Sequence, residues 1–153
     1  MTNPAGKAPL RCRDIMTADV NTATGAMTIG EVAALMRDGD VGSLPVVDGG
    51  KLTGIVTDRD IVVRALANGK GTDTPVSEAM TSEIFSVTPD EPAFQAIRLM
   101  GEKQVRRVPV VNGDGSLAGI ISMADVVLQT EDDREIAETL EEISSGSAFW
   151  GAR

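Results

Sequence analysis

The chain has 153 residues, 42% hydrophobic and 24% charged, a globular composition long enough for one compact domain or two small units that share a core. Its net charge of −9, from 14 basic and 23 acidic residues, argues against a nucleic-acid partner, because the phosphate backbone attracts basic surfaces. The absence of His and the single Cys12 exclude disulfide frameworks and zinc clusters within one chain.

Hydropathy and cysteine usage suggest a protein of the cytoplasm. No apolar run approaches the ~18 residues of a membrane span, and the segment 1–9, which we expect to be flexible, has no hydrophobic signal-peptide core. We therefore expect a cytoplasmic location and no membrane partner. Cys12 is predicted to be a lone thiol, with a redox switch or an intermolecular disulfide as the alternatives.

The first predicted elements are a short strand near Val20 and an amphipathic helix. Thr28 and Glu31 have the spacing of a capping box, in which each side chain bonds a backbone N–H of the other residue. The apolar residues that follow recur on one helical face. They are Ile29, Val32, Ala33 and Met36.

A pair of strands and a second helix come next. Apolar strands are expected at 44–47 and 52–56, joined by the turn sequence 48–50. The second helix is expected to begin near Thr57 and to end near Gly69, because Asn-Gly is a typical helix stop.

The second half of the chain repeats this order of elements. A strand is expected at 85–87, a helix from Pro92, strands at 108–111 and 117–121, and a helix from Ser122. The predicted apolar face of the Pro92 helix has four members. They are Ala93, Ala96, Ile97 and Met100.

An internal duplication organises these elements. Met16-Thr17 recurs as Met80-Thr81, 64 residues later, and the segment 52–61 faces 117–126 after one inserted residue in a turn. Each copy reads β-α-β-β-α over about 60 residues, which is marginal for an isolated domain. We therefore predict an α+β fold in which the two copies pack together and share a core.

The repeated segments resemble the CBS domains, which occur in tandem as Bateman modules. The resemblance rests on 14–17, 42–47 and 54–60, and on the second copies at 105–111 and 119–125. It implies two CBS units, residues 10–73 and 74–130, packed with pseudo-twofold symmetry. It also implies a small stand-alone bacterial protein that forms a homodimer.

Two short motifs carry the chemistry. Thr57-x-x-Asp60 and Ser122-x-x-Asp125 each lie where a predicted strand meets a helix. Hydroxyl and N–H groups at a helix start can hold a phosphate, and a nearby carboxylate can accept hydrogen bonds from two ribose hydroxyls. The same spacing also suits helix capping, which is the alternative interpretation. In CBS domains these positions resemble an adenosine-ribose and phosphate site.

The resemblance also implies which residues surround the ligand. Residues expected around the adenine are Val20, Val41, Gly42, Leu44 and Pro45 in the first unit, and Val87, Val108 and Pro109 in the second. Because the protein is acidic overall, anionic phosphates need positive partners, and Arg59, Arg106 and Arg107 are the candidates. The alternative for each arginine is ordinary surface solvation.

The last residues differ in charge from the rest. The segment 131–153 carries a net charge of −5, against −4 for residues 1–130. Ile136, Leu140 and Ile143 form a narrow apolar stripe on a predicted C-terminal helix. This segment is either a solvated helix with a frayed end or a docking site for a partner.

Together these features predict a non-catalytic regulatory module. It would bind AMP, ADP or ATP, with NAD or S-adenosylmethionine as further candidates, in a cleft between the two units, and alter a surface for an effector protein. No catalytic cofactor is expected, and an enzyme is disfavoured because the chain has no His and no paired nucleophile and base. The alternative is a ligand-independent dimeric scaffold that acts through its acidic C-terminal segment.

Overall fold

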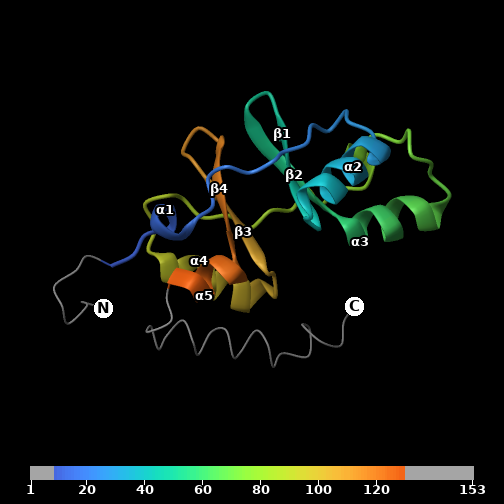
Figure 1. The fold of residues 1–153 in the computed structure, drawn as a ribbon. Coiled ribbons are helices and arrows are strands. Elements are labelled where there is room, and N and C mark those ends of the chain that lie inside the picture. Colours follow the sequence, from blue (N-terminus) through green and yellow to red (C-terminus); the bar gives the residue numbers. More distant parts are fainter. Residues whose placement is uncertain (1–8, 130–153) are drawn as a thin grey trace. The chain divides into compact units, whose positions relative to one another are not determined.

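The computed structural model describes residues 9–129, so the predicted helix within 131–153 lies outside the described residues. The chain divides into two compact units, each a mixture of helices and strands (Figure 1). We call Val20–Ile84 together with Asp114–Leu117 the Thr57 unit. The described residues up to Asp19, Phe85–Gly113 and those from Ala118 onward form the Ser122 unit.

The Thr57 unit is built on a helix and an antiparallel hairpin. Helix α2 (Ile29–Gly39) precedes strands β1 (Ser43–Asp48) and β2 (Lys51–Thr57). Gly49 and Gly50 join the strands with φ angles of 58° and 77°, the left-handed conformation that a two-residue hairpin turn requires. The strand pair predicted from the apolar runs is confirmed, and each strand is one residue longer than predicted at each end.

The helical segment after β2 changes its winding twice. It begins as α3 (Asp58–Asp60), continues as one π-helical turn, η1 (Ile61–Ala65), and ends as the 3₁₀ turn η2 (Leu66–Asn68). Gly69, with a φ of 75°, ends it, as predicted from Asn-Gly. A further 3₁₀ turn, η3 (Val76–Glu78), follows in the same unit.

The Ser122 unit has the corresponding elements plus a short leading helix. Its elements are α1 (Cys12–Ile15), α4 (Ala93–Lys103), β3 (Arg107–Val111), β4 (Leu117–Ser122) and α5 (Met123–Gln129). Strands β3 and β4 pair in a second two-stranded sheet. The predicted α+β class is thus confirmed.

The sequence predicts the helix starts and most of the buried helix faces correctly, but not the strand expected at the start of each repeat. Thr28 and Glu31 form the expected capping box, and all four predicted apolar residues of α4 are buried. In α2, Ala33 is exposed, so the apolar face is narrower than predicted. The strands expected near Val20 and at 85–87 are wrong: only single parallel bridges form, Ala23 with Val46 and Val87 with Val110.

Each compact unit takes a leading segment from the opposite sequence repeat. Cys12 and Ile15 lie in the core of the Ser122 unit, whereas Val76 and Ala79 lie in the core of the Thr57 unit. The units therefore do not coincide with the sequence repeats. The buried Cys12 thiol is fully shielded from solvent, so an intermolecular disulfide would require local unfolding.

Two glycines make these exchanged segments fit. A Cβ atom on Gly119 would lie 2.7 Å from the Thr17 carbonyl oxygen and 2.9 Å from the Met16 sulfur. A Cβ atom on Gly54 would lie 2.8 Å from the Met80 sulfur and 2.9 Å from the carbonyl oxygen of the following threonine. In each unit the repeated Met-Thr pair thus packs directly against the repeated glycine, and a side chain at the glycine would obstruct this contact.

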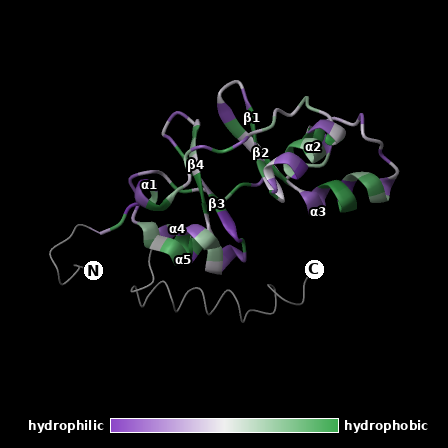
Figure 2. Ribbon diagram, in the orientation of Figure 1, coloured by the Kyte–Doolittle hydropathy of each residue, from purple (hydrophilic) through white to green (hydrophobic). Residues whose placement is uncertain are grey.

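Several apolar side chains remain exposed on the helices that follow β2 and β4. Val62, Val63 and Leu66 are about half exposed, and Leu128 is 75% exposed. Figure 2 shows hydrophobic bands alternating with hydrophilic ones along the helical segment after β2. Across residues 9–129, no helix is long and apolar enough to cross a membrane.

Candidate functional site

The Thr57 motif is a reciprocal cap at the end of β2. The Asp60 N–H donates to Thr57 Oγ1 at 3.0 Å, and the Thr57 N–H donates to Asp60 Oδ2 at 3.0 Å. Thr57 is the last residue of β2 and still has an extended backbone, and the helical segment begins at the next residue, Asp58. The motif therefore makes the contacts of a helix cap, and one carboxylate oxygen, Oδ1, is left outside the cap.

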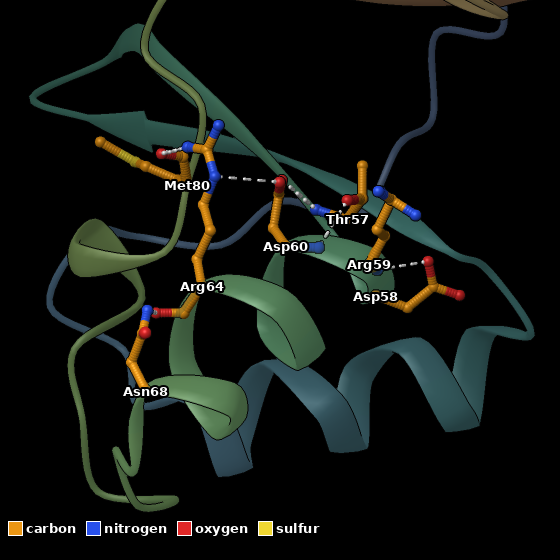
Figure 3. A network of polar contacts seen from close by, with 7 residues as sticks. All are labelled: Thr57, Asp58, Arg59, Asp60, Arg64, Asn68 and Met80. Atoms are coloured by element: carbon orange, nitrogen blue, oxygen red, sulfur yellow. Dashed lines mark hydrogen bonds and ion pairs between the residues drawn. The ribbon is translucent and has the colours of Figure 1, made fainter. Parts of the chain in front are cut away.

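An arginine from the π-helical turn approaches that second oxygen. Arg64 Nε lies 3.7 Å from Asp60 Oδ1, and a terminal nitrogen of Arg64 donates to the Met80 carbonyl oxygen at 3.3 Å (Figure 3). Only 13% of the Asp60 side chain is exposed, against 52% for Arg64. The pair links the capped carboxylate to the segment around Met80.

The Ser122 motif repeats the cap and replaces the arginine by a hydroxyl. The Ser122 N–H donates to Asp125 Oδ2 at 3.0 Å, and the Asp125 N–H donates to Ser122 Oγ at 3.2 Å. The Thr17 hydroxyl lies 3.2 Å and 3.3 Å from the two Asp125 oxygens. Both candidate ribose carboxylates are thus oriented by a cap and by one additional side chain.

The predicted adenine-contacting residues divide between the units. Val20, Val41, Gly42, Leu44 and Pro45 belong to the Thr57 unit, and Val87, Val108 and Pro109 to the Ser122 unit. Leu44 and Val108 are core residues with at most 1% exposure, so their side chains are packed in the units themselves. Val41 is 39% exposed, and the Gly42 carbonyl accepts the Asp58 N–H at 2.9 Å.

The backbone pairing shows which residues are equivalent in the two units. Val87 exchanges hydrogen bonds with Pro109 and Val111, and in the other unit Ala23 makes the same bonds to Pro45 and Val47. The counterpart of Val87 is therefore Ala23, three residues beyond Val20. The half-buried Val20 precedes this bridge.

The three predicted phosphate partners are all exposed. Arg59 follows Thr57 in the helical segment, and Figure 3 shows its side chain directed away from the Asp60 carboxylate. Arg107 opens β3, and the carbonyl of the preceding Arg106 accepts the Met123 N–H at 3.2 Å. Arg59 thus lies in one unit and the Arg106-Arg107 pair in the other.

Thr17 and Arg64 were not among the sequence-predicted site residues. Arg64 could have been found, because it lies four residues after Asp60, the spacing of a helical ion pair. Thr17 could not be paired with Asp125 from local pattern, because 108 residues separate them. Within the part of the chain from 9 to 129, no group of three or more metal-ligating side chains gathers into a metal site.

Comparison with known proteins matches these features to one family. The model of the CBS domain matches residues 12–66 and 76–130. CBS domain-containing protein YhcV of Bacillus subtilis is 39% identical over 132 residues, which cover 86% of this chain and 94% of that protein. Solved structures are similar as well. Hypoxic Response Protein I, crystallised with two coordinated zinc ions, has a TM-score of 0.72 and 36% identity, covering 78% of this chain and 98% of that one.

Another similar solved structure contains ligands. The CBS domain pair of MJ0100 was crystallised in complex with 5′-methylthioadenosine and S-adenosyl-L-methionine. It has a TM-score of 0.70 and 30% identity, covering 79% of this chain and 95% of that one.

Proposed function

The chain belongs to the CBS-domain family as a tandem pair, and from this premise we propose that it is a regulatory module that binds adenine nucleotides of the AMP, ADP or ATP type. CBS pairs commonly bind adenosine-containing ligands, and stand-alone CBS proteins are generally regulatory rather than catalytic. The observation that carries the proposal is the pair of capped carboxylates, Asp60 and Asp125, at equivalent places in the two units.

The geometry suits a ribose. In each unit the cap fixes one oxygen of the carboxylate, and a ribose would donate its two hydroxyls to the carboxylate as charge-assisted hydrogen bonds. The Asp60 side chain is 13% exposed, so such bonds would form in a mostly dehydrated place, where they are stronger than in water. The hydroxyls of Thr57 and Ser122 already accept an N–H, so the phosphates would depend on Arg59, Arg106 and Arg107 for positive charge.

Regulation would follow from differential binding. A nucleotide shifts the population of protein conformations only by the difference between its affinities for them. A ligand held by one unit would then change the surface offered to an effector protein. The exposed Val62, Val63 and Leu66 suit a second copy of the chain, and we propose a homodimer formed through these helices.

Thermal unfolding tests the proposal directly. The full chain is heated alone and with AMP, ADP, ATP, NAD or S-adenosylmethionine, with GMP as the control for the base. A ligand present at 100 times its Kd should add about 2.7 kcal/mol to the free energy of unfolding. The double variant Asp60→Asn, Asp125→Asn is the matched control and should lose this shift. An unmoved unfolding midpoint with all five ligands would overturn the proposal.

A further inference from the structure

The two candidate ribose carboxylates are held by unlike side chains. We infer that Arg64 is the positioning residue of Asp60 and that Thr17 is the positioning residue of Asp125, so that the two sites differ in how they depend on salt. This inference rests on the proposed function, because it concerns how each site recognises the ribose. It assigns roles to two residues outside the motifs themselves.

A cap alone leaves the carboxylate plane loosely defined. The terminal torsion of an aspartate is broad, so a bond to Oδ2 does not by itself fix where Oδ1 points. Two ribose hydroxyls need both oxygens in a defined plane. A second contact on the carboxylate is therefore required for preorganised binding.

In the Thr57 unit that second contact is ionic. Arg64 Nε is 3.7 Å from Asp60 Oδ1, and the same guanidinium is anchored to the Met80 carbonyl at 3.3 Å. The Asn68 amide donates to the Arg64 carbonyl oxygen at 3.0 Å, which braces the helical turn that presents the arginine (Figure 3). Because 52% of the Arg64 side chain is exposed, dissolved salt can screen this contact.

In the Ser122 unit the second contact is neutral. The Thr17 hydroxyl faces both Asp125 oxygens, at 3.2 Å and 3.3 Å. Its position is fixed by the backbone bridge to Ile120, in which the two residues exchange N–H···O bonds of 2.8 Å and 3.0 Å. The residue equivalent to Arg64, 65 positions later, is Gln129, which carries no charge. The hydroxyl contact does not depend on a formal positive charge and is less sensitive to salt.

In both units an additional side chain therefore contacts the capped carboxylate, and the units differ in the type of that contact. Thr81, the counterpart of Thr17, makes the same kind of backbone bridge, to Ile55. In that unit, however, the carboxylate is approached by Arg64. The difference predicts two sites with similar ribose geometry and different electrostatics.

The test uses uncharged probes, adenosine and 2′-deoxyadenosine, so that salt acts on the protein and not on a phosphate. Calorimetric titration measures the Kd of each nucleoside. The Kd of 2′-deoxyadenosine divided by the Kd of adenosine is the ratio that reports contact with the ribose 2′-hydroxyl. Asp125→Asn isolates the Asp60 site, and Asp60→Asn isolates the Asp125 site. In the first background Arg64→Gln should lower the ratio about fivefold, and in the second Thr17→Val should do the same.

Exchanged variants and salt provide the controls. Thr17→Val in the Asp125→Asn background and Arg64→Gln in the Asp60→Asn background should leave the ratio unchanged. Arg64→Lys, which retains the charge, should keep part of the selectivity. Raising the ionic strength from about 0.01 M to about 1 M should lower the ratio at the Asp60 site and spare the Asp125 site.

The outcomes separate this inference from the proposed function. If adenosine binds and the double aspartate variant abolishes binding, but Arg64→Gln and Thr17→Val leave the ratio unchanged, the positioning roles are wrong and the nucleotide site stands. Equal salt dependence at the two sites would also overturn the inference. If neither nucleoside binds the unmodified chain, the proposed function and the inference fall together.

Discussion

The Thr57 unit and the Ser122 unit share a cap and differ in the group that meets the capped carboxylate. Asp60 faces the Arg64 guanidinium, whereas Asp125 faces the Thr17 hydroxyl. In both units the cap joins residues three positions apart, so the local sequence determines it. The additional contact comes from Arg64, four residues after Asp60, in one unit and from Thr17, 108 residues before Asp125, in the other. In this contact the two copies have diverged. Duplication has thus preserved the geometry of the carboxylate and varied its electrostatic setting.

The largest predicted effect tests the close backbone contact that both units share. Gly119→Ala and Gly54→Ala should each lower the free energy of unfolding by about 1–3 kcal/mol, because the new methyl group would meet a carbonyl oxygen at under 3 Å. Gly113→Ala is the matched control, since a Cβ atom there meets nothing within 4 Å. Chemical denaturation measures all three. If only one of the two variants lowers the free energy of unfolding, the close contact does not stabilise the two units equally.

The cores of the two units differ at one titratable position. Cys12 in the Ser122 unit corresponds to Val76 in the Thr57 unit, 64 residues later, and both are fully buried. Burial, reinforced by the nearby Glu91 charge, raises the pKa of the Cys12 thiol from its ordinary value of 9.0 to about 11. The folded protein therefore holds this proton more tightly than the unfolded chain does.

This difference predicts a pH dependence with a definite sign. The stability from the raised pKa of Cys12 is fully present below pH 9 and is lost as the pH rises toward 11. The loss should be about 1.4 kcal/mol at pH 10. Cys12→Val, which copies the other unit, should remove this part of the alkaline slope. Parallel slopes for the variant and the unmodified chain would contradict the assignment.

The caps are expected to contribute less and to contribute equally. Thr57→Ala and Ser122→Ala each remove an oxygen that accepts a backbone N–H, at 3.0 Å and 3.2 Å, and should lower stability by about 1 kcal/mol. Thr57→Ser retains the oxygen and should lose little. Thermal unfolding without ligand measures these differences. A negligible loss in both alanine variants would mean that the caps do not stabilise the helices.

Sequence predicts the parts of this fold that short-range chemistry decides. The capping box at Thr28, the helix stop at Gly69 and the apolar face that contains Ile97 depend on spacings of a few residues, and all three are confirmed. The helix that follows Thr57 was expected, but its π-helical turn was not, because no local pattern marks such a turn.

The long-range parts of the site could not be read in the same way. The motif at Asp60 was visible as a carboxylate three residues after a hydroxyl. The approach of Thr17 to Asp125 depends on which repeat receives the leading segment, and periodicity within a repeat contains no information on that choice. Burial is also a long-range property: the side chain of Leu44 lies in the core at 1% exposure, so any contact it makes with a ligand would be through its backbone.

The smallest predicted effect concerns the acidic segment, which lies outside the described residues. Deleting 131–153 should change nucleotide affinity by less than about twofold if the capped carboxylates hold the ligand, since every contact described above lies within residues 9–129. Calorimetry with AMP measures this. Loss of partner capture with unchanged nucleotide binding would assign docking to the segment. Loss of nucleotide binding would contradict the location of the sites.

The most direct measurement of the central claim is calorimetric titration of AMP into four proteins: the unmodified chain, Asp60→Asn, Asp125→Asn and the double variant. Each single variant should lose one binding event and retain the other, and the double variant should retain neither, because a neutral amide accepts ribose hydroxyls more weakly than a carboxylate. Unchanged affinity and stoichiometry in the double variant would show that these carboxylates do not hold the nucleotide.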